Sequence, residues 1–310
     1  MRDDPSSNDI GVRLVDPAAF DWSADSGAAA DVRRVIAAAD AADQVVNLNE
    51  AACLHLKNRG LADAVLHLAD GGFALLYDDT LDLVVAPEAR GHGVGTALAT
   101  AALAGAETEV NAWSHSDHPA AARIAARLGL RRDRELWVME RPLDDSLPTA
   151  APTPDYRVRS FRPGDEEGLL AANALAFAHH PEQGQMSLED FHERMEESWF
   201  DPAGLFLAVP AAASNGDGAA PEHRVLGFHW TKVHPEGFGE VYVVAVNPKA
   251  AGRGIGKVLT NTGLLHLRDL GLAKVILYVD GDNDPAIAVY DRAGFSHVRT
   301  ETQYRGIPAR

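Results

Sequence analysis

The residues of this sequence best suited to chemistry are a carboxylate that precedes a glycine-rich turn and a phenol that follows it. Glu240 comes directly before the apolar run Val241–Val246, and Tyr290 lies in a predicted helix further along the chain. A carboxylate can take a proton from an attacking amine, and a tyrosine hydroxyl can give one to a departing thiolate. An isolated strand-start glutamate or helix tyrosine is more often structural, so the interpretation depends on the turn between them.

That turn, Gly252-Arg253-Gly254-Ile255-Gly256, lies between a predicted strand and a predicted helix. The strand stops at Asn247-Pro248, and apolar residues recur at helical spacing from Val258 onward. The first amides of a helix have no intrahelical partner, and glycines let an anion approach them closely. The turn can therefore bind a phosphate or pyrophosphate, although a purely structural strand-to-helix turn would have the same sequence pattern.

A second copy of this stretch lies 161 residues earlier in the chain. The shift aligns Pro87 with Pro248, Gly93 with Gly254, Gly95 with Gly256 and Leu98 with Leu259. An internal repeat on this scale predicts two similar domains. The same shift aligns Glu240 with Asp79, and alignment of Gly129 with Gly294 puts Ala125 opposite Tyr290. The first half therefore carries the turn but lacks the tyrosine.

Composition limits the classes of partner. The net charge of −17 disfavours nucleic acid and anionic membranes, and no apolar run approaches the ~18 residues of a membrane span. The single cysteine, Cys53, allows no intrachain disulfide and fits a reducing cytoplasm, and the N-terminus does not resemble a signal peptide. His115 and His118 beside Asp117 lack a third metal ligand, so we interpret them as solvated loop residues and expect no metal.

The length of 310 residues fits two domains. We predict an N-terminal domain over 1–143, a Pro-rich linker over 144–154 and a C-terminal domain over 155–310. Periodicity and turn residues predict helices near 31–42, 48–59, 95–104, 120–128, 165–177, 188–200, 257–270 and 284–293. Strands are predicted near 64–68, 73–77, 81–85, 109–113, 156–159, 205–209, 225–232, 241–246, 274–279 and 295–304. The fold class is α/β (α+β), with a mixed central sheet flanked by helices in each domain.

The motif Arg90-Gly91-His92-Gly93-Val94-Gly95, after a strand and before a helix, resembles the GNAT acetyltransferase superfamily. The Tyr290 to Gly294-Phe295 segment adds to the likeness. The resemblance implies two tandem GNAT-like domains whose glycine turns bind the pyrophosphate of acetyl-CoA. The second copy departs from the motif, because Ala251 stands where Arg or Gln is usual.

Three longer phrases are more specific, and they resemble the mycothiol synthase family of actinobacteria. They are Phe-Ala-His-His-Pro-Glu-Gln-Gly at 177–184, Trp-Phe-Asp-Pro at 199–202 and Gly-Phe-His-Trp-Thr-Lys-Val-His-Pro at 227–235. The resemblance implies acetyl transfer from acetyl-CoA to the cysteinyl amine of desacetylmycothiol, giving mycothiol and CoA. It also implies that the C-terminal domain is catalytic, whereas the N-terminal domain is catalytically degenerate and binds only the cofactor. We expect a cytoplasmic monomer.

The same resemblance implies roles for individual residues. Glu240 would be the base and Tyr290 the acid. The implied substrate contacts are Glu50, Glu182, Lys232, Glu240 and Tyr278. The implied cofactor contacts of the first domain are Leu83, Val84, Val85, Arg90, Gly91, His92, Gly93, Val94 and Gly95. Those of the second domain are Val244, Ala245, Val246, Ala251, Gly252, Arg253, Gly254, Ile255, Gly256, Lys257, Asn283, Asp284, Pro285, Ala286, Ile287 and Ala288.

Two other functions fit the same residues. A tandem acetyltransferase could act on another small amine or on a protein N-terminus. Alternatively, both domains could hold acyl-CoA as a sensor without catalysis, although the presence of Glu240 and Tyr290 in one half argues against this.

Overall fold

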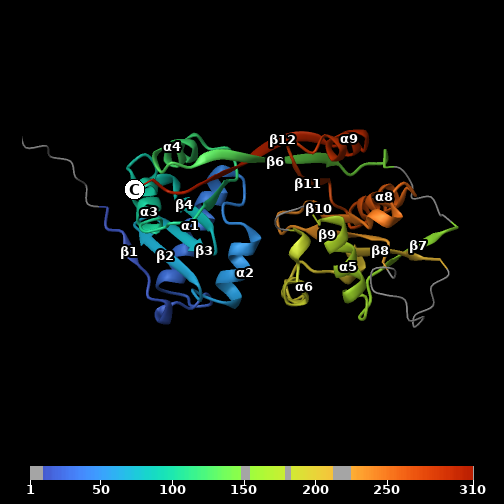
Figure 1. The fold of residues 1–310 in the computed structure, drawn as a ribbon, viewed down its shortest axis with the longest axis horizontal. Helices are drawn as coiled ribbons and strands as arrows, with labels where there is room; N and C mark the ends of the chain where they lie inside the picture. The colour runs from blue at the N-terminus through green and yellow to red at the C-terminus, as the bar shows by residue number, and fades with distance from the viewer. Residues whose placement is uncertain (1–9, 148–153, 179–182, 212–224, 310) are drawn as a thin grey trace, which may run out of the picture. The chain divides into compact units, whose positions relative to one another are not determined.

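The computed structural model describes residues 10–147, 154–178, 183–211 and 225–309, which divide into two compact units (Figure 1). Unit 1 comprises 1–137, 280–282 and 299–310, and unit 2 comprises 138–279 and 283–298. Strands β6 (Arg131–Pro142) and β12 (Ser296–Gly306) contribute residues to both units. The units thus differ from the contiguous domains predicted at 1–143 and 155–310, because the last strand gives its end to unit 1. The predicted linker at 144–154 lies partly outside the described residues.

Unit 1 contains a mixed sheet whose strands follow the order β1, β2, β3, β4, β5, β12. The strands are β1 (Arg13–Leu14), β2 (Ala64–Ala69), β3 (Gly72–Tyr77), β4 (Thr80–Val85) and β5 (Val110–Ser114), with residues 302–306 of β12. β2, β3 and β4 pair antiparallel, whereas β4 and β5 run parallel. Gly71, in the predicted hairpin, has a left-handed φ of 74° that allows the tight turn between β2 and β3.

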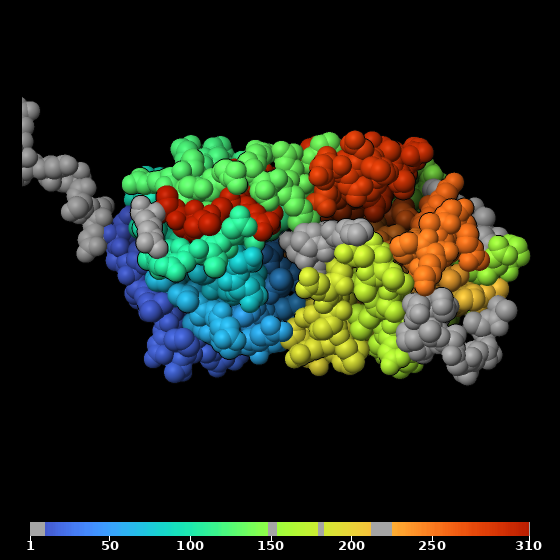
Figure 2. Space-filling view, viewed as in Figure 1, coloured from blue at the N-terminus to red at the C-terminus, as the bar shows by residue number. Residues whose placement is uncertain are grey.

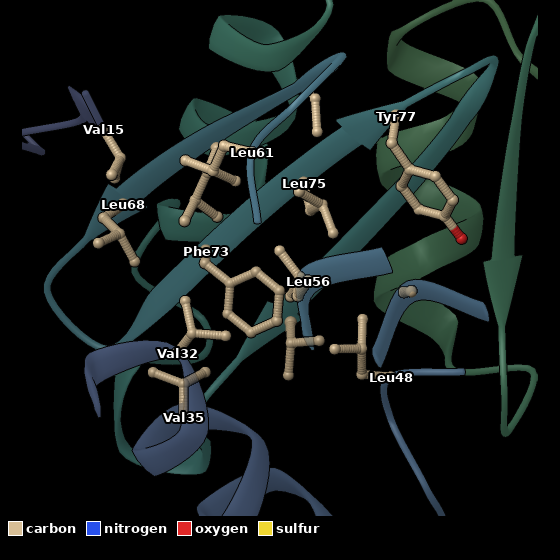
Figure 3. Close-up of a cluster of buried hydrophobic side chains, with 14 of the residues drawn as sticks. Val15, Val32, Val35, Leu48, Leu56, Leu61, Leu68, Phe73, Leu75 and Tyr77 are labelled. Carbon is tan, nitrogen blue, oxygen red and sulfur yellow. The ribbon is translucent and has the colours of Figure 1, made fainter. Parts of the chain in front are cut away.

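Helices cover both faces of this sheet because successive strand side chains point to opposite sides. Helices α1 (Ala28–Asp43) and α2 (Glu50–Asn58) pack on the face that carries Phe73 and Leu75. Figure 3 shows Val32 and Val35 of α1 against Phe73 in this cluster. Helices α3 (Val94–Ala102) and α4 (Pro119–Arg127) pack against the other face, which carries Ala74. Short 3-10 helices η1 (Pro17–Ala19) and η2 (Pro87–Ala89) complete the unit.

Unit 2 repeats this design, with strands in the order β7, β8, β9, β10, β11. They are β7 (Tyr156–Ser160), β8 (Leu205–Pro210), β9 (Gly227–Val233), β10 (Gly239–Val246) and β11 (Lys274–Asp280). The helices are α5 (Glu166–Ala176), α6 (Leu188–Met195), α8 (Ile255–Asp269) and α9 (Asp284–Arg292), with 3-10 turns η3 (Gln183–Gln185), η4 (Pro202–Gly204) and η5 (Pro248–Ala250). α5 and α6 pack on the face with Phe228 and Trp230, and α8 packs on the opposite face. Both α8 (orange) and α9 (red) lie at the surface of this unit in Figure 2.

Within each unit, a strand glycine lies in close contact with a leucine of the helix that follows the glycine turn. A Cβ at Gly72 would lie 2.9 Å from Cδ1 of Leu98, and one at Gly227 would lie 3.2 Å from Cδ1 of Leu259. Leu98 and Leu259 are aligned by the sequence repeat. Both glycines therefore let the first helix after the glycine turn approach its sheet, in agreement with a duplicated fold.

Most predicted elements lie within a few residues of their observed bounds, and the exceptions are β1, β6 and the end of α6. The two-residue strand β1 was not predicted. Strand β6 was not predicted, because its first half is dominated by the charged residues of 131–135 and its second half ends beside the Pro-rich stretch. The helix predicted at 188–200 ends at Met195, and Asp201 then begins η4 by accepting from the Ala203 amide. Among the described helices, none has the length and apolar character needed to cross a bilayer.

A buried histidine ties β9 to α8. His229 is fully buried, and its Nδ1 lies 2.8 Å from the carbonyl oxygen of Leu259, so Nδ1 carries the proton and donates. Gly263 leaves room for the ring, since a Cβ there would lie 2.1 Å from Cε1 of His229. Burial lowers the pKa of His229 to about 4, although the bond to Leu259 opposes this effect. The ring is therefore neutral in the folded protein at pH 7.

We predict that His229 makes unit 2 less stable as the pH falls from 6.5 to 4. In that window the unfolded histidine binds a proton and the folded one does not, which removes up to about 3 kcal/mol. Urea unfolding followed by tryptophan fluorescence at pH 7 and 4.5 measures the loss. The loss should be smaller in His229→Gln and unchanged in His297→Gln, a substitution at an exposed site on β12. An equal loss in wild type and His229→Gln would contradict the prediction.

Candidate active site

Strand β10 separates from its parallel neighbour after two residues. Gly239 and Glu240 pair with Val275 and Ile276 of β11, whereas β10 pairs with β9 as far as Val246. The register with β9 shifts between Val241 and Val243, so Tyr242 is an additional residue, a β-bulge that bends the strand. Beyond Glu240, the edge of β10 that faces β11 therefore has main-chain groups outside the ladder between these two strands.

The glycine turn follows this free edge. Asn247 is almost fully buried and accepts a hydrogen bond from the amide of Lys249, which fixes the start of η5. Gly252 and Gly254 then adopt left-handed φ values of 78° and 74°, and α8 begins at Ile255. Ile255 is buried beneath the turn, whereas residues 251–254 are exposed. The first amides of a 15-residue helix thus lie at an exposed turn, which suits an anion.

Three of the predicted substrate contacts share one face of the unit 2 sheet. Lys232 of β9 lies directly opposite Glu240 of β10, and Glu240 lies opposite Ile276 of β11. Tyr278 follows Ile276 by two residues, so its side chain emerges on the same face. Tyr278 is 37% exposed, whereas Glu240 is 7% exposed. We call Lys232, Glu240 and Tyr278 the acceptor face.

Glu240 is held by a histidine from the loop that precedes its strand. Nε2 of His234 lies 2.6 Å from Oε2 of Glu240, and both side chains are largely buried. The His234 ring stacks on Phe238 with centroids 4.3 Å apart. The His234 amide donates to the Phe238 carbonyl at 2.9 Å, and Gly237 has a left-handed φ, so the tight loop folds the ring back toward the strand. The carboxylate is therefore fixed before any substrate binds.

Aromatic rings surround the ammonium group of Lys232. Its Nζ lies 4.5 Å from the ring centroid of Trp199 and 5.3 Å from that of Tyr242. The two rings are 5.0 Å apart, and Trp230 packs against both. Nε of Arg194 donates to the Tyr242 hydroxyl at 3.0 Å. The bulge therefore places Tyr242 where it orders the cation of the acceptor face.

Tyr290 lies on α9, the helix that follows β11. Its ring makes an edge contact with Phe295 at 5.8 Å between centroids. Burial raises the pKa of the Tyr290 hydroxyl, so it stays protonated at neutral pH and can donate. Asn283 begins the helix by accepting from the amide of Ala286 at 3.2 Å. The predicted cofactor contacts Asn283–Ala288 thus form the exposed or half-buried first turn of α9.

Unit 1 contains a cavity where its own two parallel strands separate. β4 pairs with β5 only at Thr80–Asn111 and Leu81–Ala112, and Gly91 and Gly93 have left-handed φ values of 80° and 88° before α3. A cavity of about 520 Å³ lies at this divergence. Its walls include most of the predicted cofactor contacts of this unit, namely Leu83, Val84, Val85, Arg90, Gly91, Gly93, Val94 and Gly95. His92 instead lines a separate, more polar hollow with Arg34 and Glu88.

Comparison with known proteins identifies the family. The family model described as acetyltransferase (GNAT) family matches residues 58–130 and 173–295. The chain belongs to the GNAT acetyltransferase family. A protein of Nocardioides sp. named mycothiol acetyltransferase is 49% identical over 293 residues, covering 89% of this chain and 97% of that one. One of Actinosynnema mirum with the same name is 46% identical, covering 89% and 95% of the two chains.

Solved structures agree on the tandem GNAT fold. A GCN5-related N-acetyltransferase of Sphaerobacter thermophilus gives a TM-score of 0.65 at 24% identity, covering 96% of each chain. A tandem GNAT protein from the clavulanic acid biosynthesis pathway also gives 0.65, at 17% identity, covering 95% of this chain and 98% of that one. The predicted family, fold class and class of enzyme, an acetyltransferase, are confirmed. GNAT acetyltransferases use acetyl-CoA, whereas its contacts in this chain stay predictions.

The arginine of the GNAT motif has a structural partner in unit 1. The guanidinium of Arg90 binds both carboxylate oxygens of Asp43 at 2.7 and 2.8 Å, and its Nε donates to the Val85 carbonyl at 2.9 Å. The side chain therefore ties the turn to α1 and β4. Ala251 cannot make such contacts, but the capping side chain of Asn247 supports the second turn instead. The departure at Ala251 thus has a structural compensation.

Two predicted substrate contacts do not belong to the described strands of the unit 2 sheet. Glu50 belongs to unit 1 and occupies the first position of α2, after the capping residue Asn49. Glu182 lies outside the described residues. Both stay predictions.

The acceptor face is replaced in unit 1. In unit 1, Tyr77 lies five residues after Gly72 and pairs with Thr80. In unit 2, Lys232 lies five residues after the matching Gly227 and pairs with Glu240. Because β10 has the bulge, Glu240 corresponds in register to Thr80 and not to Asp79. Burial raises the pKa of the Tyr77 hydroxyl, and burial raises that of Asp82 to about 6. Unit 1 thus has a buried tyrosine and a half-buried threonine where unit 2 has a lysine and a fixed carboxylate.

The interpretation of His115 as a solvated loop residue was wrong. Its side chain is only 12% exposed, and Nδ1 lies 2.9 Å from Oε2 of Glu301, a residue of the distant strand β12. Burial opposes its charge, yet Glu301 and the nearby Asp82 raise the pKa of His115 overall. His118 caps α4, with Nδ1 accepting from the Ala120 amide at 3.1 Å. A long-range strand pairing produced the His115 contact, so local sequence gave no signal of it.

Sequence reasoning missed four residues around the acceptor face: His234, Arg194, Trp199 and Tyr242. His234 and Trp199 lie in the phrases that carried the family resemblance, which was the available signal for them. Tyr242 reads as an ordinary strand residue because a bulge has no simple sequence pattern. Arg194 reads as part of the polar face of α6.

We predict that the two glycine turns respond differently to the same substitution. Gly254→Asp adds a negative charge and a side chain at an exposed left-handed position, so kcat/KM for acetyl-CoA should fall at least about tenfold. Gly93→Asp, at the matched position of unit 1, should change the transfer rate only modestly. Steady-state kinetics with calorimetric binding of acetyl-CoA measures both. Near-complete loss of rate in Gly93→Asp would contradict a catalytically degenerate first domain.

Proposed function

We propose that the chain transfers acetyl from acetyl-CoA to the cysteinyl amine of desacetylmycothiol, forming mycothiol and CoA. The observation that carries the proposal is the 49% identity, over nearly the whole of both chains, to a relative named mycothiol acetyltransferase. The fixed carboxylate of Glu240 on an otherwise polar and aromatic face adds support from chemistry. We further propose a cytoplasmic monomer as the working form.

The acceptor face suits a small molecule that carries both an amine and hydroxyl groups. The Glu240 carboxylate can accept from an ammonium group, and the Lys232 ammonium can donate to hydroxyl oxygens. Tyr278, which is partly exposed, offers a hydroxyl and a flat ring to the same molecule. We propose that these three side chains contact the substrate, together with Glu50 and Glu182.

Two proton movements accompany the transfer. We propose that Glu240 takes a proton from the substrate ammonium, so that the free amine can attack. Because His234 occupies Oε2, the remaining oxygen Oε1 is the one to face the amine. Tyr290 would donate its hydroxyl proton to the leaving thiolate, and its raised pKa keeps that proton available at neutral pH. The second proton, which the nitrogen loses as the amide forms, would pass through solvent and replace the one that Tyr290 gives.

The free edge of β10 and the turn before α8 fit a long thioester cofactor with an anionic end. When bound, acetyl-CoA supplies the activated acetyl group. We propose that main-chain groups of Val244, Ala245 and Val246 hold its acyl and pantetheine part, and that residues 251–257 hold the pyrophosphate. Amide donors aimed at a developing oxyanion typically contribute about 3 kcal/mol each. Asn283–Ala288 of α9 would lie along the cofactor.

For unit 1 we propose cofactor binding without turnover. Support comes from the cavity of about 520 Å³ at its glycine turn and from Thr80, Tyr77 and Ala125 at the places of Glu240, Lys232 and Tyr290. His92 faces the separate hollow, so its side chain is the least suited of the predicted contacts.

The test is acetyl transfer to purified desacetylmycothiol, with free CoA thiol followed over time and the amide product identified by mass. Formation of mycothiol supports the proposal. Transfer only to other small amines or to peptide N-termini would favour a tandem acetyltransferase of different specificity. Binding of acetyl-CoA with no transfer to any amine would favour a sensor.

We predict that Glu240→Gln lowers kcat by a factor of about a hundred or more, as loss of a general base typically does. The amide keeps the size of the side chain but cannot accept the proton. Acetyl-CoA affinity should change little, and a calorimetric titration checks this. A rate within twofold of wild type would exclude Glu240 as the base.

We predict that Tyr290→Phe slows turnover about tenfold or more and spares acetyl-CoA binding, because only the hydroxyl is removed. Tyr304→Phe is the control, since it removes the hydroxyl of a tyrosine that packs in the core of unit 1. Unchanged kcat in Tyr290→Phe, with thiol release measured directly, would remove Tyr290 from the mechanism.

A further inference from the structure

We infer that His234 is a positioning residue for acetyl transfer, holding the Glu240 carboxylate by an Nε2–H···Oε2 hydrogen bond so that Oε1 faces the substrate amine. The inference rests on the proposed function, in which Glu240 takes a proton from that amine. The distance of 2.6 Å between Nε2 and Oε2 is that of a strong hydrogen bond to a charged group. Rotation of the Glu240 side chain away from this geometry would break the bond.

The histidine is itself fixed from two sides. Its ring stacks on Phe238 at an angle of 16° between planes, and its amide donates to the Phe238 carbonyl. A left-handed Gly237 closes the loop, with its amide donating to the His234 carbonyl at 2.9 Å. This five-residue loop between β9 and β10 has little freedom, so the position of Nε2 is set by the hairpin and not by the substrate.

Two lysines, Lys232 and Lys274, lie on the strands that flank Glu240. Lys232 lies opposite Glu240 on β9, and its ammonium sits over the rings of Trp199 and Tyr242. On β11 the residue opposite Glu240 is the apolar Ile276. Lys274, also on β11, lies 5.6 Å from the ring centroid of Phe238 and binds Glu140 at 2.7 Å. Among the described residues, His234 thus binds Glu240 by its side chain, and Lys232 is the cross-strand neighbour of Glu240 on β9.

A general base must present a lone pair toward the amine and stay ionised until it takes the proton. A carboxylate that is free to rotate spends part of its time in geometries that cannot reach the amine. His234 removes this freedom and leaves one oxygen for the proton. The acetyl group and acetyl-CoA do not contact His234 in this scheme, so it acts only through Glu240.

The test compares three variants of the full chain in acetyl transfer to desacetylmycothiol. His234→Leu removes the donor and should lower kcat about tenfold or more, with little change in KM for acetyl-CoA, since a hydrogen bond to a charged group is lost. His234→Gln retains an N–H donor on a similar stem and should recover most of the rate. His297→Leu, at an exposed histidine of β12, should behave as wild type.

A second measurement does not depend on the acceptor. Carboxyl carbons of glutamate are labelled with ¹³C, and the Glu240 signal is assigned by its loss in Glu240→Gln. Its chemical shift should change in His234→Leu and be largely restored in His234→Gln. An unaltered signal, or a kcat in folded His234→Leu equal to that of wild type, would overturn the inference. If the wild-type chain transfers no acetyl group but its Glu240 signal still depends on His234, the proposed substrate is wrong. The positioning of Glu240 by His234 is then still supported.

Discussion

The chemistry of unit 2 depends on the early separation of two parallel strands. β10 and β11 pair only at Gly239 and Glu240, and the bulge at Tyr242 bends β10 away from the ladder. If β10 and β11 paired along their whole length, the main-chain groups of Val244–Val246 would form hydrogen bonds with β11. The strand edge that leads to the glycine turn would then have no groups available for a ligand. The last paired residue is Glu240, so the proposed base lies where the strands part. One geometric feature thus brings together a strand edge outside the β11 ladder, an exposed glycine turn and a carboxylate.

Unit 1 has the strand divergence and the glycine turn but not the acceptor face. β4 and β5 also part after two residue pairs, and left-handed glycines also precede the next helix. No bulge occurs in β4, because its register with β3 is continuous from Thr80 to Val85. Without the extra residue, Thr80 and Tyr77 occupy the places of Glu240 and Lys232, and Asp82 is buried beside Tyr77. The divergence therefore suffices for a cavity, whereas the acceptor face requires particular side chains and the bulge.

Local patterns predicted the parts of this structure that local forces determine. Glycines with positive φ, the turn pair after β10 and the apolar periodicity of α8 are all short-range signals, and the duplication made them easier to recognise. Strand β6 was not predicted, because Arg131–Glu135 are charged and the strand pairs with residues far away in the sequence. The bulge, the His115–Glu301 pair and the fold of His234 onto Glu240 depend on register and loop geometry. The shift of 161 is correct after the bulge and wrong by one residue before it, which is why Asp79 was matched to Glu240.

The second glycine turn departs from the GNAT motif at Ala251, and a different side chain supports it. In unit 1, Arg90 spans from the turn to Asp43 and to the Val85 carbonyl, so the turn is tied down by a charged side chain. In unit 2, the residue at the place of Ala86 is Asn247, whose side chain holds the Lys249 amide from a nearly buried position. The neutral side chain of Asn247 thus supports the turn of unit 2, whereas the charged side chain of Arg90 supports that of unit 1. The backbone angles of the two turns agree to within about 15°, by their φ values of 80° and 88° against 78° and 74°. Two different side-chain solutions therefore give one backbone shape, and the shape is what presents the helix amides.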